Sequence, residues 1–208
     1  MSKRYIISIL LGILFIILTV LVMQDKLVDF DNYVYNVVTS NMNDKLTIFY
    51  KIFTFLGSTV FMVSLCVVVF IFFLIIKRKD FAFISASILI ISTIINNVIK
   101  LIIKRGRPVL ENPLVYEKSY SFPSGHTMAA VSMYGILIYI INKSNLNKKL
   151  KITLSIILGT IPILVMLSRI YLGAHFASDV IGALLVSSIL LLVGTCIIDK
   201  KGWIKHHE

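Results

Sequence analysis

The chain has 208 residues, of which 58% are hydrophobic and 15% are charged, whereas a soluble domain has about 45–50% apolar and about 25% charged residues. Apolar runs of roughly 20 residues recur, and a helix of that length crosses about 30 Å of hydrocarbon. This pattern excludes a disordered chain, a disulfide scaffold, a coiled coil and a transmembrane β-barrel, and it predicts an all-α integral membrane protein.

Six membrane-spanning helices are predicted within a single domain, residues 1–208. In chain order the predicted spans are about 5–23, 55–76, 81–103, 124–142, 150–168 and 177–198. The first span follows a basic start, as a secretory signal does, but it is longer than the usual apolar region of about 7–15 residues, and no small-residue cleavage site follows it. We therefore predict that it is retained as a span.

The segment 24–54, between the first two predicted spans, is polar and contains two amphipathic stretches. Their apolar residues recur at helical spacing: Leu27, Phe30, Val34 and Val37, then Met42, Leu46, Phe49 and Phe53. Such helices suit the membrane interface. Two interpretations are open for them: they flank the access route of a lipid, or they form a structural cap.

The basic residues indicate the orientation. The 21 Lys and Arg residues exceed the 10 Asp and Glu residues, which gives a net charge of +11 at pH 7. Most of the cations alternate onto one side of the membrane: Lys3, Arg4, Lys77, Arg78, Lys79, Lys143, Lys148, Lys149, Lys151, Lys200, Lys201 and Lys205. Basic segments favour the cytoplasmic side, and anionic lipid accounts for their charge without a nucleic acid partner. We predict a cell-membrane protein with both termini in the cytoplasm.

Another set of charged and polar residues gathers at the extracytoplasmic ends of the predicted spans. They are Lys100 and Arg107 at the end of 81–103, Ser124, Gly125 and His126 at the start of 124–142, Arg169 after 150–168, and His175 and Asp179 at the start of 177–198. Odd spans end on this side and even spans begin there, so the alternation brings these residues to one level. Because a charge at the centre of a membrane helix costs about 2.5–3.5 kcal/mol, their convergence predicts a functional site.

Each of these features also has a purely structural interpretation. Lys100 and Arg107 share a helix face two turns apart, but basic flanks are common at the ends of spans. The sequence Pro-Ser-Gly-His at 123–126 suits an ordinary helix start, yet a helix N-terminus also binds anions. His175 and Asp179 stack on one helix face, where the carboxylate orients one ring nitrogen. Together, three cations, a helix N-terminus, two histidines and a carboxylate predict a pocket for phosphate.

The sequence resembles the type 2 phosphatidic acid phosphatase (PAP2) superfamily in three motifs, which occur in the order typical of that family. They are Lys-x6-Arg-Pro at 100–108, Pro-Ser-Gly-His at 123–126 and Ser-Arg-x5-His-x3-Asp at 168–179. No motif position departs from the pattern, and the six-span layout extends the likeness to nearly the whole chain. The resemblance implies a bundle of six transmembrane helices that hydrolyses lipid phosphates.

The resemblance also implies a role for each motif residue. His175 would be the nucleophile that forms a phosphohistidine, Asp179 would orient it, and His126 would be the general acid that protonates the leaving oxygen. The phosphate would be held by Lys100, Arg107, Ser124, Gly125 and Arg169. The scheme requires no metal and no other cofactor, because Asp179 is the only carboxylate in the motifs and Glu111 and Glu117 are too sparse for a two-metal site.

The resemblance leaves the substrate open among lipid phosphates of the outer leaflet, namely undecaprenyl pyrophosphate, phosphatidylglycerophosphate and phosphatidic acid. Six spans disfavour the soluble relatives in the superfamily, the vanadium-dependent haloperoxidases. A lipid transporter or scramblase is the alternative from another class, but it would distribute polar residues across the membrane depth, whereas here they gather at one end. A catalytically silent scaffold disagrees with the complete set of His126, His175 and Asp179. The sequence leaves the oligomeric state open.

Overall fold

The computed structural model describes residues 3–109 and 114–202, and these residues form an all-helical protein. Eight helices follow one another in this part of the chain, with no strand among them. They are α1 (Lys3–Met23), α2 (Val28–Thr39), α3 (Asp44–Phe55), α4 (Thr59–Ile75), α5 (Lys79–Ile103), α6 (Gly125–Lys143), α7 (Lys148–Tyr171) and α8 (Ala177–Lys201). The predicted all-α fold is confirmed.

Five of these helices, α1, α5, α6, α7 and α8, are each long and apolar enough to cross a membrane. The helix α4 has 17 residues, and it passes the same test only together with α3, as a pair bent by 48°. The described residues therefore hold five spans, or six if the bent pair is one of them.

The second predicted span, 55–76, differs from the structure at its start. The chain bends after α3, and α4 begins only at Thr59, where the hydroxyl of Ser58 caps it. At Gly57, within the bend, an added Cβ would meet Cγ1 of Val165 at 2.6 Å. The bend therefore packs closely onto α7, a tertiary contact that the apolar pattern of the sequence does not reveal.

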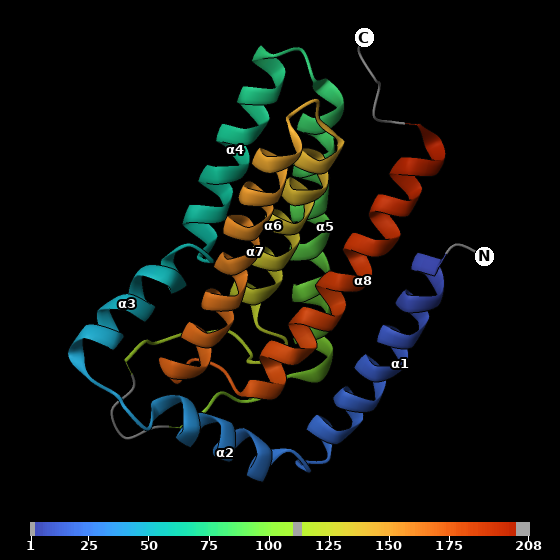
Figure 1. Ribbon diagram of the computed structural model, residues 1–208. Coiled ribbons are helices and arrows are strands. Elements are labelled where there is room, and N and C mark those ends of the chain that lie inside the picture. The colour runs from blue at the N-terminus through green and yellow to red at the C-terminus, as the bar shows by residue number, and fades with distance from the viewer. Residues whose placement is uncertain (1–2, 110–113, 203–208) are drawn as a thin grey trace.

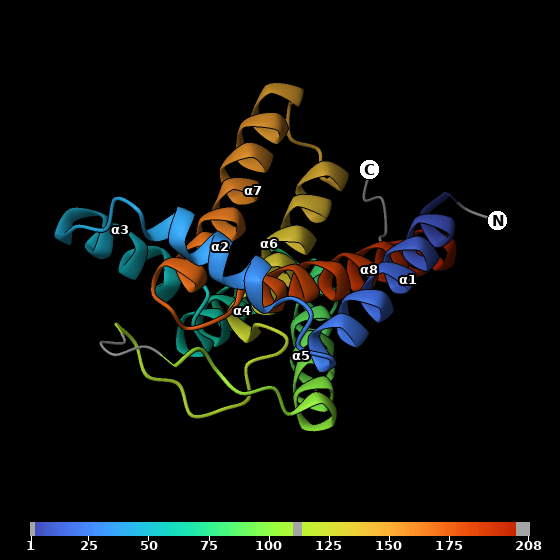
Figure 2. The ribbon, with the colours of Figure 1, turned by 90° about the horizontal axis from the view of Figure 1, so that it is seen from below.

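The longer helices form a bundle around α6 (Figure 1). The helix α6 packs against α4, α5, α7 and α8, while α1 lies along α8 at one edge. Figure 2 views the bundle from below and shows α2 crossing the ends of α7 and α8. The two amphipathic stretches of 24–54 thus form helices, as their spacing predicts, and α2 covers part of one end of the bundle.

The interior of the bundle is apolar, and so is much of its outer surface. The main core lies between α4, α5, α6 and α7 and includes Met62, Met133 and Val165. On the outside, side chains such as Leu10 and Ile16 of α1 are more than half exposed. A helix that is apolar all round suits a membrane span, so this surface supports the assignment made from length and composition.

Asp199, near the end of α8, joins three helices at the end of the bundle opposite α2. Its carboxylate accepts hydrogen bonds from Arg4 at 2.6 Å and from the hydroxyl of Tyr139 at 2.8 Å, and it pairs with Lys143 at 2.7 Å. Because Arg4 lies in the first turn of α1, the start of α1 and the end of α8 meet here. The α4–α5 and α6–α7 turns lie toward the same end (Figure 1).

Candidate active site

A cavity of about 280 Å³ lies where α5 ends and α6 begins, toward the end of the bundle that α2 covers. Five predicted site residues line it: Lys100, Arg107, Gly125, His126 and His175. They come from the end of α5 and the loop after it, from the first turn of α6, and from the turn before α8. The tertiary structure therefore brings the three sequence motifs to one place.

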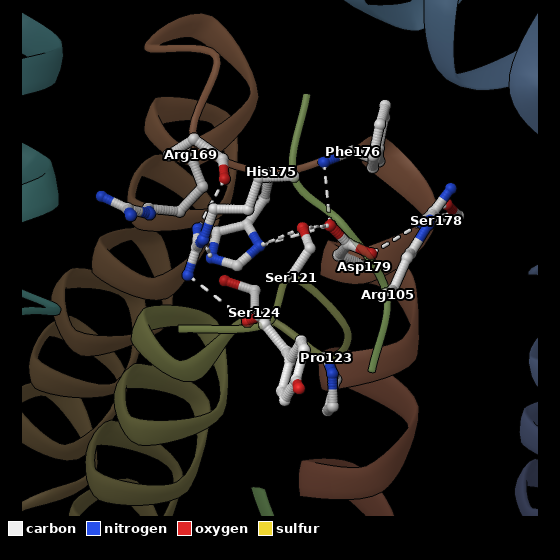
Figure 3. Close-up of polar contacts among 12 residues, drawn as sticks. Arg105, Ser121, Pro123, Ser124, Arg169, His175, Phe176, Ser178 and Asp179 are labelled. Atoms are coloured by element: carbon white, nitrogen blue, oxygen red, sulfur yellow. Dashed lines mark hydrogen bonds and ion pairs between the residues drawn. The ribbon is translucent and has the colours of Figure 1, made fainter. Parts of the chain in front are cut away.

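His175 and Asp179 form a buried pair at the start of α8 (Figure 3). Nδ1 of His175 lies 3.3 Å from Oδ2 of Asp179, and the same oxygen accepts a hydrogen bond from the amide of Phe176 at 3.0 Å. The hydroxyl of Ser121 donates to this oxygen as well. The first turn of α8 and the loop before α6 thus fix the carboxylate against the imidazole ring.

The other ring nitrogen of His175 faces Arg107. Nη1 of Arg107 lies 3.2 Å from Nε2 of His175 and also donates to the carbonyl oxygen of Ala174 at 2.7 Å. Since a guanidinium only donates hydrogen bonds, this contact assigns the proton of the ring to Nδ1, beside Asp179, and a lone pair to Nε2.

Burial keeps His175 neutral. Removal of the ring from water lowers the pKa of His175 to about 4, although the hydrogen bond to Asp179 opposes this shift. At pH 7 the imidazole is therefore uncharged. The charge of Arg107 acts in the same direction as burial.

His126 lies in the first turn of α6, which is tightly packed against α5. The amide of Asn96 donates to the carbonyl oxygen of Pro123 at 3.1 Å, and an added Cβ at Gly125 would lie 3.2 Å from Oδ1 of Asn96. Only glycine therefore lets the two helices approach this closely without displacing the asparagine. The hydroxyl of Ser124 accepts a hydrogen bond from the amide of Thr127 and so caps the helix.

Two of the predicted phosphate ligands do not line the cavity. Ser124 is fully buried, and its hydroxyl serves the helix cap. Arg169 is 1% exposed, and its guanidinium donates to Oε1 of Glu117 at 2.5 Å and to the hydroxyl of Thr54 at 2.6 Å. Its Nε is buried and has no hydrogen-bond partner among the described residues.

Glu117 connects Arg169 to the cavity. Its carboxylate lines the cavity and lies 4.0 Å from Nδ1 of His126. Burial alone would raise the pKa of Glu117, but the charges of Arg169 and then His126 outweigh burial and hold the pKa below its usual value. An ionised carboxylate therefore lies beside the second histidine.

Lys100 and Arg107 are held by the loop between α5 and α6. The ammonium of Lys100 donates to the carbonyl oxygen of Tyr120, and Nε of Arg107 donates to the carbonyl oxygen of Ser119 at 2.7 Å. Burial lowers the pKa of Arg107, and the charges of Glu117 and Asp179 oppose that shift. Both cations thus border the cavity beside His175.

Sequence reasoning missed a buried charge network behind Asp179. Nη1 of Arg105 donates to Oδ1 of Asp179 at 2.6 Å, and Nη2 donates to Oδ2 of Asp31 at 2.8 Å. Asp31 lies on α2 and is 2% exposed. The sequence carries one signal for it: at helical spacing, Asp31 falls within the apolar stripe of Leu27 and Val34, where an acidic residue is out of place.

The cavity adjoins an apolar groove between α4 and α5. Val63, Leu89 and Thr93 line both the cavity and a second hollow of about 330 Å³, whose other lining residues are Cys66, Val67, Ile90 and Ile94. Of these two adjoining spaces, the cavity is polar and basic beside His175, and the groove is apolar along the helices. Within the described residues, no three His, Cys, Asp or Glu side chains lie close enough together to hold a metal ion.

The profile of the PAP2 superfamily matches residues 81–203. A curated relative, phosphatidylglycerophosphatase B of Bacillus subtilis (strain 168), is 42% identical over 101 residues, which are 48% of this chain and 49% of the relative. The chain thus spans about half the length of that relative in this match.

Among solved structures, a transmembrane PAP2 type phosphatidylglycerolphosphate phosphatase from Bacillus subtilis is 30% identical with a TM-score of 0.86, over 97% of this chain and 98% of the other. Aquifex aeolicus LpxE is 26% identical with a TM-score of 0.62, over 79% and 93% of the two chains.

Proposed function

The chain belongs to the PAP2 superfamily, and we propose from this premise that it is an integral membrane phosphatase that removes phosphate from a phosphorylated lipid. The observation that carries the proposal is the pair of adjoining spaces, of which one is basic and histidine-lined and the other is apolar. A lipid phosphate has the same division between its phosphate and its chains. The oligomeric state does not enter the proposal.

Phosphatidylglycerophosphate is the first substrate to test. The curated relative and the solved structure from Bacillus subtilis are both named for activity on this lipid. Undecaprenyl pyrophosphate and phosphatidic acid present the same phosphate chemistry to the cavity, so they form the comparison set.

In the proposed reaction, His175 attacks the phosphorus atom through Nε2. The bond between phosphorus and the lipid oxygen breaks, and His126 donates the proton that the leaving oxygen takes up. Positive charge develops on the imidazole of the phosphohistidine, and Asp179 stabilises it through Nδ1–H. His126 then accepts a proton from water, the resulting hydroxide attacks the phosphohistidine, and inorganic phosphate leaves neutral His175 behind.

The cations stabilise the charge of the transferred phosphoryl group. Lys100 and Arg107 border the cavity beside His175. Together with the start of α6 at Gly125, they hold the non-bridging oxygens of the phosphoryl group. Arg169 joins them when the phosphate takes the place of the Glu117 carboxylate on its guanidinium. Ser124 contributes by capping α6, and no step requires a metal.

We place the cavity on the extracytoplasmic side of the cell membrane. The basic turns at 77–79 and 143–151 lie toward the opposite end of the bundle (Figure 1), and basic segments favour the cytoplasm. A lipid of the outer leaflet then reaches His175 by way of the α4–α5 groove.

The first test is phosphate release by purified protein in detergent micelles that contain a chelator. We expect release from phosphatidylglycerophosphate, and we expect His175→Ala to reduce it by about 10³-fold or more, because the nucleophile is lost. Arg4→Met, at the opposite end of the bundle, serves as the control variant and retains the activity.

Two outcomes contradict the proposal. Loss of activity of the wild-type protein on chelation would show that a metal takes part. No release from any of the three lipids by folded protein would favour a lipid transporter, which is tested by following the movement of a labelled lipid across vesicles.

A further inference from the structure

The buried charges behind the active site are arranged around Arg105. The side chains of Asp31 and Asp179 have no exposed surface, and that of Arg105 is 12% exposed. Arg105 lies between the two carboxylates, and its guanidinium is also 4.1 Å from the centre of the Phe176 ring. Two buried negative charges thus share one cation that is largely shielded from water.

The carboxylate of Asp31 is fixed by more than the ion pair. Its Oδ1 accepts a hydrogen bond from the amide of Ser178 at 2.8 Å, and its Oδ2 accepts one from the hydroxyl of Ser178 at 2.7 Å. That hydroxyl in turn lies 2.7 Å from Nη1 of Arg105. Asp31 therefore ties α2 to the first turn of α8 and holds the guanidinium in place.

This arrangement fixes the plane of the Asp179 carboxylate. Arg105 binds Oδ1, whereas Oδ2 faces Nδ1 of His175 and the amide of Phe176. A rotation of the carboxylate out of this plane would break the contacts on both sides. Arg105, which does not line the cavity, thus holds the Asp179 carboxylate from the side away from His175.

The following inference rests on the phosphatase function proposed above. We propose that Arg105, held by Asp31 of α2, is a positioning residue that fixes the Asp179 carboxylate against the nucleophile His175. The helix α2 then does more than cap the bundle, because it supplies the charge that holds Arg105. The role is distinct from that of Arg107, which contacts His175 itself.

The test compares Arg105→Lys and Asp31→Asn with the wild-type protein. A lysine keeps the positive charge but cannot bridge both carboxylates as a planar fork does. We expect kcat to fall about 10- to 100-fold in each variant, as for other outer partners that orient a functional histidine. KM should stay near the wild-type value, because neither residue lines the cavity.

A second set of variants separates positioning from stability. If Arg105 acts through Asp179, then Arg105→Lys should cause little further loss of kcat in an Asp179→Asn background. The matched control is Arg4→Met, which breaks another arginine–aspartate ion pair, that of α1 with α8 at 2.6 Å. We expect it to lower the unfolding temperature without lowering kcat.

Three results would overturn the inference: a raised KM at unchanged kcat, unchanged kcat together with a lower unfolding temperature, or a full additional loss of kcat in the Asp179→Asn background. Should Arg105→Lys fail to fold, the decision rests on Asp31→Asn, which keeps the shape of the side chain. Wild-type protein without activity on any lipid contradicts the proposed function and this inference together. An active wild type with fully active variants contradicts the inference alone.

Discussion

At His175 the two ring nitrogens face different partners, and this asymmetry defines the chemistry of the site. Nδ1 faces the carboxylate of Asp179 at 3.3 Å, and Nε2 faces Arg107 at 3.2 Å. The cation beside Nε2 disfavours protonation of that nitrogen, so a lone pair remains at the cavity. In the proposed reaction the same cation also binds the incoming phosphate and so brings it to Nε2.

The lowered pKa of His175 has a consequence for stability. The folded protein binds the proton of His175 only near pH 4, whereas an unfolded histidine binds it near pH 6.5. The unfolded state therefore holds more protons between these values, and the free energy of unfolding falls as the pH falls from about 6.5 to about 4. Above about pH 6.5 the histidine contributes no pH dependence.

We expect a His175→Gln variant to lose less stability than the wild type over this acidic range, by about 3 kcal/mol at most, since one pKa unit corresponds to about 1.4 kcal/mol. The measurement is the unfolding temperature in detergent at pH 4, 5, 6 and 7. Identical pH dependence of the two proteins would mean that His175 titrates near its ordinary value.

At the scale of elements, the helices α4 and α5 line both the histidine-lined cavity and the apolar groove beside it. Val63, Leu89 and Thr93 belong to both the polar cavity and the apolar groove. The bend at Gly57 sets the start of α4 and therefore the position of its part of this groove. In the proposed reaction, the lipid chains and the phosphate occupy these two adjoining but chemically different spaces.

A bulky side chain at the junction should interfere with lipid binding. We expect Val63→Trp to raise KM for a long-chain lipid phosphate about tenfold, which corresponds to about 1.4 kcal/mol of binding free energy. KM for p-nitrophenyl phosphate, which has no chain, should not change. Val63 is 54% exposed, so the fold has room for the larger residue.

Val68→Trp is the matched control, because Val68 lies on the same helix, is 64% exposed and lines neither space. An equal effect of both substitutions on KM, or an equal effect on both substrates, would argue against the groove as the chain-binding site.

At the scale of the whole molecule, the cavity and the basic turns lie at opposite ends of the bundle. The site lies at the α2 end, whereas the contacts of Asp199 and the basic turns lie toward the other end. Because basic segments favour the cytoplasm, this distribution supports the proposed extracytoplasmic position of the cavity.

This orientation is tested with single cysteines and a maleimide that does not cross membranes. Cys66 and Cys196 are free and are first replaced by alanine. We expect Lys118→Cys, in the exposed loop beside the cavity, to react in intact cells. Lys149→Cys, exposed in the first turn of α7, should react only after permeabilisation. The reverse pattern would place the site in the cytoplasm.

The sequence by itself determined the membrane class, the helical fold and five of the residues that line the cavity. The long apolar runs leave the chain no alternative to helices in lipid, because every backbone polar group must be satisfied within the span. Alternation of helix direction then brings Lys100, Arg107, His126 and His175 together without any knowledge of packing. These features depend on local periodicity and on spacing along the chain.

Only the tertiary structure decided how the site is supported and where it opens. Three contacts join residues that are far apart in the chain. The bend at Gly57 packs onto α7, Glu117 pairs with Arg169, and Arg105 bridges Asp31 and Asp179. Such contacts depend on how the helices pack, and the same sequence pattern is compatible with an Asp31 that faces water. The motifs therefore supply the reacting groups, while the packing of α2, α4 and the α5–α6 loop fixes their orientation.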